Sequence, residues 1–191
     1  MPRIGLLAVQ GDYARHREAF RRAGVADEDI LDVRTPEELA QVERLVIPGG
    51  ESTTVGLLLQ RFGLGDAIRA RAGEGMPIWG TCMGMIMLAK DVEGREQYTL
   101  GLLDITVRRN AFGAQVHSFE DLVEILGFDP PLTAVFIRAP VVTRCGEGVE
   151  TLATYDGQVV AVRQGNLWGT SFHPEMTDDP RLHALFANSA L

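Results

Sequence analysis

The sequence has few features of secreted, membrane-bound or nucleic-acid-binding proteins. Its two cysteines, Cys82 and Cys145, form neither a disulfide framework nor a Cys-x-x-Cys metal site. No apolar run approaches the length that spans a bilayer, and the N-terminal run Ile4–Val9 is too short for the core of a signal peptide. A formal net charge of −8 disfavours nucleic acid as a partner. We therefore expect a cytosolic (cytoplasmic) protein with no membrane and no nucleic-acid partner.

The composition is that of an ordinary folded protein. The chain has 191 residues, of which 46% are hydrophobic and 23% are charged. A chain of this length can bury a full core, and this balance argues against disorder. Because no repeat or linker divides the sequence, we expect a single domain over residues 1–191.

The first half of the chain alternates short apolar strands with helices. An amphipathic helix is expected over Tyr13–Ala23, with Asp12 as its N-cap, and a second helix begins after Thr35. Three strands are predicted around them: Arg3–Val9, Ile30–Val33 and Leu45–Ile47. This alternation predicts an α/β fold with a mostly parallel central sheet covered by helices on both faces.

The second half is richer in strands. It starts with the alternating segment after Leu102 and ends in a helix expected over Arg181–Ala190. Between them, short strands separated by Gly, Pro and Asp turns are predicted: Leu122–Leu126, Ala134–Ile137, Leu152–Tyr155, Val159–Val162 and Asn166–Phe172. These segments predict antiparallel strands added to the parallel core.

The stretch Met76–Ala89 indicates a nucleophile. Its first part is typical of a buried strand and its last part of a helix, with Gly80 and Gly84 on either side of Cys82. A small-x-nucleophile-x-small pattern allows a tight strand-to-helix turn to project a side chain above the sheet edge. At a helix N-terminus, the macrodipole favours a thiolate. The alternative is that Cys82 is a small buried apolar residue.

A glycine-rich loop, Pro48–Thr54, follows the third predicted strand. Gly49 and Gly50 allow backbone amides to face the carboxyl edge of the sheet, where open α/β sheets bind ligands. Such amides can stabilise an oxyanion in acyl transfer. The plainer interpretation is a loop with Ser52 or Thr53 as the N-cap of the next helix. A phosphate cradle ranks lower because the loop lacks the Gly-Lys-Ser/Thr end of a P-loop.

The last predicted strand ends in His173-Pro174-Glu175. A histidine oriented by a carboxylate is the base that a cysteine nucleophile needs. The alternatives are a solvated turn and a metal site with Cys82, which lacks an evident fourth ligand. The remaining histidines, and Cys145 in its loop, are expected to play no part in the site; His16, His117 and His183 are expected at the surface.

Motifs across the whole chain resemble those of one enzyme family. The cysteine and His-Pro-Glu motifs resemble those of class I, triad-type glutamine amidotransferases. More narrowly, the chain resembles the glutaminase subunit of pyridoxal 5′-phosphate synthase, the two-subunit enzyme of vitamin B6 biosynthesis. The segments that carry this narrower resemblance are IGLLAVQG at 4–11, PGGESTT at 48–54, RRNAFGAQVHSF at 108–119, FIRAP at 136–140 and SFHPEMTDD at 171–179.

The resemblance implies roles for individual residues. Cys82 is implied as the nucleophile, His173 as the base and Glu175 as the carboxylate that orients it. The amides of Gly50 and Met83 are implied as oxyanion donors. The residues implied to bind L-glutamine are Gly49, Gly50, Glu51, Arg109, Ile137 and Arg138. The resemblance implies no metal and no cofactor.

The resemblance also implies a partner. Ammonia released from glutamine would pass to a separate barrel-shaped synthase subunit, and we expect the oxyanion loop to be misaligned until that subunit docks. Three residues depart from the family pattern: Met83 stands in place of a small residue, Ala114 in place of an arginine, and His117 in place of an acidic or polar residue. Two alternatives stay open, namely a glutaminase for another ammonia acceptor and a non-catalytic regulatory subunit.

Overall fold

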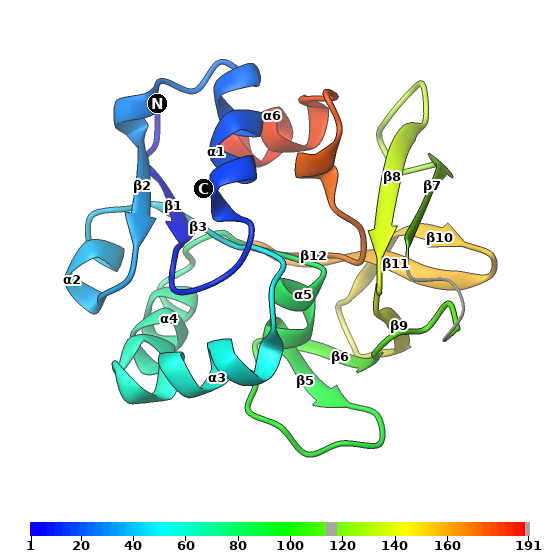
Figure 1. Ribbon diagram of the computed structural model, residues 1–191, viewed down its shortest axis with the longest axis horizontal. Coiled ribbons are helices and arrows are strands. Elements are labelled where there is room, and N and C mark those ends of the chain that lie inside the picture. The colour runs from blue at the N-terminus through cyan, green and yellow to red at the C-terminus, as the bar shows by residue number, and fades with distance from the viewer. Residues whose placement is uncertain (114–117, 190–191) are drawn as a thin grey trace.

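The computed structural model describes residues 1–113 and 118–189, in which most strands belong to one large sheet (Figure 1). The strands of that sheet are β1 (Ile4–Leu7), β2 (Ile30–Val33), β3 (Arg44–Ile47), β4 (Ile78–Thr81), β5 (Ala89–Val92), β6 (Leu103–Arg108), β9 (Val141–Cys145), β10 (Glu150–Tyr155), β11 (Gln158–Gln164) and β12 (Leu167–Thr170). A separate antiparallel pair is formed by β7 (Ser118–Val123) and β8 (Leu132–Ile137).

The large sheet has a parallel half and a mostly antiparallel half. Its order is β2-β1-β3-β4-β12-β11-β9-β6-β5, with β10 paired to β11. Every pair from β2 to β12 is parallel. The pairs β12–β11, β11–β9 and β9–β6 are antiparallel, whereas β5 pairs with β6 in parallel. The prediction of a mostly parallel core with added antiparallel strands is therefore confirmed.

Helices cover both faces of the parallel half (Figure 1). In the described residues the helices are α1 (Tyr13–Arg22), α2 (Pro36–Leu39), α3 (Ser52–Arg61), α4 (Leu64–Gly73), α5 (Met83–Leu88) and α6 (Arg181–Asn188), with 3-10 turns η1 (Asp27–Asp29) and η2 (Pro174–Met176). Two apolar cores result. On β3, Leu45 and Ile47 join the core under α3 and α4, whereas Val46 joins the core under α1 and α6. Strands buried on both faces explain the continuous apolar runs in the sequence.

Two strands were not predicted. β5 and β9 carry mixed short sequences that lack both clear alternation and a sustained apolar run. Cys145 was expected in a loop, but it is the last residue of β9 and is exposed. β9 forms because its neighbours β6 and β11 supply the ladder on both sides, an effect of tertiary pairing that local sequence does not encode.

The helix starts agree only partly with the expected caps. The Thr35 hydroxyl accepts a hydrogen bond from the Glu38 amide, and the Glu38 carboxylate accepts one from the Thr35 amide, which completes a capping box at α2. Asp12 occupies the N-cap position of α1, but its side chain makes no capping hydrogen bond. The carboxylate of Asp12 is therefore available for another role.

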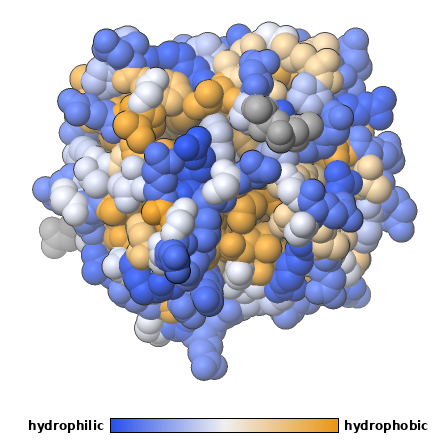
Figure 2. All heavy atoms as spheres, turned by 180° about the vertical axis from the view of Figure 1, so that it is seen from behind, coloured by the Kyte–Doolittle hydropathy of each residue, from blue (hydrophilic) through white to orange (hydrophobic). Residues whose placement is uncertain are grey.

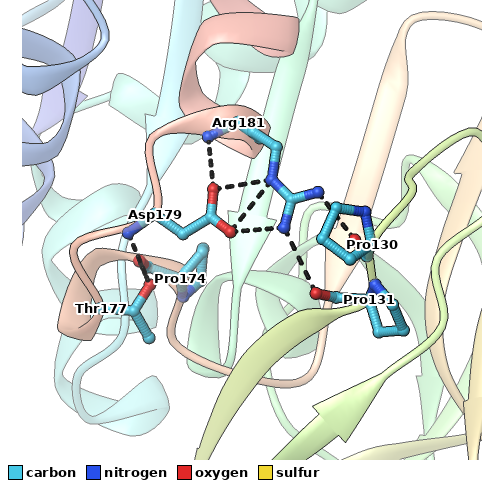
Figure 3. Close-up of polar contacts among 6 residues, drawn as sticks. All are labelled: Pro130, Pro131, Pro174, Thr177, Asp179 and Arg181. Carbon is cyan, nitrogen blue, oxygen red and sulfur yellow. Dashed lines mark hydrogen bonds and ion pairs between the residues drawn. The ribbon is translucent and has the colours of Figure 1, made fainter.

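Arg181 ties the start of α6 to the turn between β7 and β8 (Figure 3). Its guanidinium donates to the carbonyl oxygens of Pro130 and Pro131 at 2.7 and 3.3 Å, and to the carboxylate of Asp179 at 2.7 Å. The hydroxyl of Thr177 donates to the carbonyl of Pro174 at 3.2 Å. These contacts fix the segment that directly follows Glu175.

Arg181→Ala is expected to lower the melting temperature by about 2–4 °C, because several backbone and carboxylate hydrogen bonds are lost at once. Arg21→Ala is the matched control, since among the described residues the Arg21 side chain pairs only with Glu18, one turn away, and is half exposed. Its expected shift is less than about 1 °C. Thermal unfolding of the two variants followed by circular dichroism measures the difference, and equal shifts would contradict the anchoring role of Arg181.

The surface mixes polar and apolar residues. On the face opposite to that of Figure 1, apolar patches lie between hydrophilic side chains (Figure 2). Large apolar residues that are at least 45% exposed are Met1, Leu57, Phe62, Leu122, Leu126 and Leu185. None of the helices in residues 1–113 and 118–189 combines the length and apolar character needed to cross a membrane.

Candidate active site

Cys82 stands on a sharp turn between β4 and α5. Its backbone has φ 51° and ψ −108°, a conformation that side-chain-bearing residues rarely adopt. Gly84 permits the turn because a Cβ atom at that position would collide with the backbone carbonyl of Ile47 on β3. The Cys82 amide donates to the Thr170 carbonyl at 2.7 Å, which joins the turn to β12. The sulfur is thus held at the carboxyl edge of the parallel strands, as the glycine pattern predicted.

His173 and Glu175 follow β12 on the neighbouring strand end. The His173 amide donates to the Val135 carbonyl on β8 at 2.8 Å, and Glu175 lies in the 3-10 turn η2. The His173 Nδ1 atom lies 2.6 Å from the Glu175 Oε1 atom. Both side chains are buried. This short contact fixes the ring, with Nδ1 toward the carboxylate.

The pKa values of this pair move in opposite directions. Burial alone lowers the pKa of His173, but hydrogen bonds with Cys82 and Glu175 outweigh it and raise the pKa to about 10. Burial alone raises the pKa of Glu175, but its electrostatic interaction with His16 and the charge and hydrogen bond of His173 outweigh burial and lower that pKa. Glu175 is therefore an anion that supports a proton on His173.

A cavity of about 310 Å³ opens beside the sulfur. Its lining residues are Asp12, Gly50, Glu51, Ser52, Cys82, Met83, Ile86, Arg109, Asn110, Ile137, Arg138 and His173. The sulfur of Cys82 lies 3.7 Å from the carbonyl oxygen of Ile137, to which the thiol can donate. The structure therefore brings most of the expected site residues to one cavity.

Two expected site residues do not line that cavity. Glu175 lies behind His173, consistent with an orienting role. Gly49 packs against the His173 ring, and a Cβ atom at Gly49 would lie 2.6 Å from the ring Cε1 atom. Its carbonyl accepts from the Asp12 amide at 3.1 Å. Glycine at position 49 is thus explained by the close approach of the imidazole.

The N-cap of α3 is Glu51, so the expectation of Ser52 or Thr53 at this position is wrong. The Glu51 carboxylate accepts from the amides of Thr53 and Thr54 at 3.1 and 2.8 Å. These hydrogen bonds, that of Thr54 above all, lower the pKa of Glu51 to about 2. The Glu51 amide donates to the side-chain oxygen of Gln10 at 2.9 Å. Glu51 is therefore a fixed anion at the cavity rim.

Strained backbone gathers at the cavity. In the described part of the chain, the non-glycine residues with positive φ are Cys82, Asn110, Arg138 and Asp156. The first three line the cavity, whereas Asp156 lies in the turn between β10 and β11. Backbone strain of this kind is concentrated at functional sites, where the surrounding structure holds it. This observation marks the cavity independently of any motif.

His16 and His183 were expected at the surface, and both expectations are wrong. Each side chain is completely buried between α1 and α6. His16 is spaced with the buried residues Ala19 and Phe20 at i, i+3 and i+4, so helical periodicity would have placed it on the inner face. The remaining histidine, His117, and the family departure at Ala114 lie outside the described residues.

Asp12 is the charged cavity residue that sequence reasoning missed as a site residue. Its position at the carboxyl end of β1 was a usable signal, because ligands of open α/β sheets bind at that edge. Asp12, His173 and Glu175 are also spaced closely enough to share a cation, with ligand atoms within 4.8 Å of one another. Since His173 and Glu175 already hold each other, a cation would have to break their hydrogen bond.

We expect the free energy of unfolding to be greatest near pH 6.5. Burial lowers the pKa of His16 and of His183 below the ordinary value of 6.5, so the unfolded chain binds more protons and stability falls as the pH drops below 6.5. The raised pKa of His173 has the opposite effect on the free energy of unfolding. It stabilises the folded chain at pH 6.5 and below, and this stabilisation is lost as the pH rises from 6.5 toward 10.

A histidine that binds a proton only in the unfolded chain contributes a slope of at most about 1.4 kcal/mol per pH unit on the acid side. Urea unfolding between pH 5 and pH 10 measures this dependence. A free energy of unfolding that stays constant between pH 6.5 and pH 5 would contradict the neutral burial of the two histidines.

Comparison with known proteins agrees with the motif resemblance. A model of the SNO glutamine amidotransferase family matches residues 6–191. The chain is 58% identical over 189 residues to the pyridoxal 5′-phosphate synthase subunit PdxT of Herpetosiphon aurantiacus, with 96% of this chain and 97% of that protein covered. It is 52% identical over 192 residues to PdxT of Mycobacterium leprae, with 98% and 96% covered.

Solved structures agree as well. The crystal structure of a glutamine amidotransferase matches with a TM-score of 0.90 at 49% identity, covering 96% of each chain. The structure of PurLQS from Thermotoga maritima shares the fold, with a TM-score of 0.69 at 18% identity and 98% of each chain covered. The resemblance found in the sequence is thereby confirmed, and this chain belongs to the SNO glutamine amidotransferase family.

Proposed function

We propose that this chain is a cytoplasmic glutaminase that hydrolyses L-glutamine to glutamate and ammonia through a thioester on Cys82, and that it supplies the ammonia to a pyridoxal 5′-phosphate synthase subunit. The observation that carries the proposal is that Cys82 and His173 meet at one cavity, with Glu175 hydrogen-bonded behind the His173 ring. A strained nucleophile turn, an imidazole within reach and a carboxylate 2.6 Å behind it form the arrangement that acyl transfer requires.

The reaction proceeds in two halves. His173 Nε2 takes the proton of the Cys82 thiol before the sulfur attacks the side-chain carbonyl carbon of glutamine, which forms a tetrahedral oxyanion. His173 then protonates the amide nitrogen, the C–N bond breaks, and ammonia leaves a γ-glutamyl thioester. A water molecule, deprotonated by His173, attacks the thioester, so that glutamate and the thiol are released.

Backbone amides stabilise the oxyanion. The first amides of an α-helix have no intrahelical carbonyl, so the Met83 amide at the start of α5 is free of such a partner. Gly50, which also lines the cavity, supplies the second amide. Both are backbone donors, so the methionine side chain at position 83 does not remove either hydrogen bond.

The charges around the cavity match the substrate. Free glutamine carries an α-carboxylate and an α-ammonium group. Among the lining residues, Arg109 and Arg138 are complementary to the carboxylate, and the carboxylates of Asp12 and Glu51 are complementary to the ammonium. Ile137 also lines the cavity, with its carbonyl oxygen 3.7 Å from the Cys82 sulfur.

The synthase partner is supported by the names of the relatives, which are subunits of pyridoxal 5′-phosphate synthase. A glutaminase that acts alone would waste glutamine, so its activity is expected to depend on docking. The Gly50–Glu51 segment is the candidate for this control, because Gln10 holds the Glu51 amide and a Cβ atom at Gly50 would collide with Gln10. Docking would reset this segment and aim the Gly50 amide into the cavity.

Glutamate release by this chain, alone and with the synthase subunit, tests the proposal. We expect slow release alone and a marked increase with the partner. Equal rates would contradict control by docking, and no release under either condition would contradict the glutaminase function. Mass spectrometry after treatment with a diazoketone analogue of glutamine gives a second readout, with covalent addition expected on Cys82.

A further inference from the structure

A buried line of polar side chains runs from α6 to the back of the active site. His183 Nε2 lies 2.9 Å from His16 Nδ1, and His16 Nε2 lies 3.1 Å from the Thr81 hydroxyl. The same His16 Nε2 atom lies 3.5 Å from Glu175 Oε2, the carboxylate oxygen that does not contact His173. All these groups are at most 2% exposed. The line joins α1, α6 and β4 to Glu175.

The contacts select one tautomer of His16. Glu175 Oε2 is fully buried and has no hydrogen-bond partner in the described residues, so His16 Nε2 is the group that faces it. If Nε2 lacked a proton, its lone pair would point at an anion. The favourable arrangement has the proton on Nε2, shared between Thr81 and Glu175, with Nδ1 accepting from the Nε2–H of His183.

Within residues 1–113 and 118–189, this arrangement leaves the Nδ1 atom of His183 buried without a hydrogen-bond partner. An unpaired buried polar atom destabilises a fold, and apolar residues at positions 16 and 183 would avoid that cost. The surroundings are suited to such residues, because Phe20, Trp79 and Phe186 pack around the two rings. A pair of histidines here therefore calls for an explanation other than packing.

His16 remains neutral in this position. The ionisable groups that face it are Glu175, His173 and Asp12 from the site and His183 from α6. Burial lowers the pKa of His16 more than Glu175 raises it, and the positive charge of His173 lowers it further. A neutral His16 gives Glu175 an N–H dipole without cancelling its charge, so the full negative charge remains for His173.

We propose that His16, with its tautomer fixed by His183, is a positioning residue that holds the second oxygen of Glu175 and keeps the carboxylate aimed at His173. The kinetic part of this inference rests on the proposed glutaminase function. The positioning itself does not, because it also governs how readily Cys82 gives up its proton to His173 in the absence of any substrate.

Three substitutions of His16 separate positioning from packing. Gln places an amide N–H near the position of Nε2, Asn reaches only as far as Nδ1, and Phe keeps the ring shape without a donor. With the synthase subunit present, we expect kcat to fall about 10- to 100-fold in His16→Phe and His16→Asn, while KM changes less than about threefold. His16→Gln should recover most of the lost kcat.

The reaction of Cys82 with iodoacetamide gives a readout that needs no glutamine. In a Cys145→Ser background only Cys82 can react, since these are the two cysteines of the chain. We expect His16→Phe to shift the pH dependence of alkylation and His16→Gln to restore it. If wild type alkylates with a histidine-dependent pH profile but releases no glutamate, the proposed function fails while the positioning role stands.

Phe20→Leu is the packing control. Phe20 contacts the His183 ring edge-on, at 4.7 Å between centroids, so this variant disturbs the same helix pair without removing a polar atom. We expect a lower melting temperature with kcat and the alkylation profile unchanged. The inference is overturned if folded His16→Phe matches wild type in both readouts. Should that variant not fold, equal kcat values for His16→Gln and His16→Asn overturn it instead.

Discussion

Replacing Cys82 with alanine is expected to lower the rate of glutamine hydrolysis about 10⁴-fold or more, because no other group in the cavity can form the thioester. The turn itself should survive, since its geometry depends on Gly84 and on the amide of residue 82. Glutamate release measured with the synthase subunit present gives the size of the loss. Binding of glutamine, measured by calorimetry, is expected to persist.

Cys145→Ser is the matched control for this variant. Cys145 is exposed at the end of β9 and does not line the cavity. Its substitution is expected to leave the rate unchanged. Residual hydrolysis in Cys82→Ala above a hundredth of the wild-type rate would contradict a covalent intermediate on Cys82, whereas unchanged hydrolysis in both variants would place the reaction elsewhere.

The parallel half of the fold was predictable because its strands are buried on both faces. Runs such as IGLL in β1 and LVI in β3 have to be continuous in apolar residues, and the helices between them show one apolar face each. The antiparallel half is harder to predict. β9 has two buried residues followed by three exposed ones, and it becomes a strand only because β6 and β11 lie beside it.

The cavity-facing groups were predicted better than the groups behind them. Cys82, Gly50 and His173 follow strands directly, and the ends of parallel strands meet at one edge of the sheet. His16 and His183 were missed because each was treated as a polar side chain on a helix. Their inward direction follows from the periodicity of α1 and α6, but their meeting depends on how the two helices pack.

Glu51 lines the cavity as expected, but its role as the N-cap of α3 was not predicted. Ser and Thr are good N-caps, and the sequence offers three of them after Glu51. Glu51 takes the position because its carboxylate reaches the amides of both Thr53 and Thr54. The same hydrogen bonds fix its charge at the cavity rim, so a capping role and a substrate-binding role are compatible.

Glu175→Gln tests whether the charge behind His173 is required. The amide keeps the size of the side chain and an oxygen that can accept from His173 Nδ1, but it removes the negative charge that raises the pKa of His173. We expect kcat to fall about 10⁴-fold, the loss seen when an orienting carboxylate is neutralised in other triads. The acid limb of the pH–activity profile of this variant should move to lower pH. A less basic His173 stays unprotonated, and so able to act as a base, down to a lower pH.

The matched control is Glu18→Gln, since Glu18 is exposed on α1 and pairs only with Arg21. Its kcat and pH profile should equal those of wild type. The two variants remove the same formal charge, so a general effect of net charge would appear in both. A Glu175→Gln enzyme with full kcat and an unshifted pH profile would mean that the carboxylate serves only to pack η2. A large loss confined to this variant would instead assign the basicity of His173 to the buried anion 2.6 Å behind it.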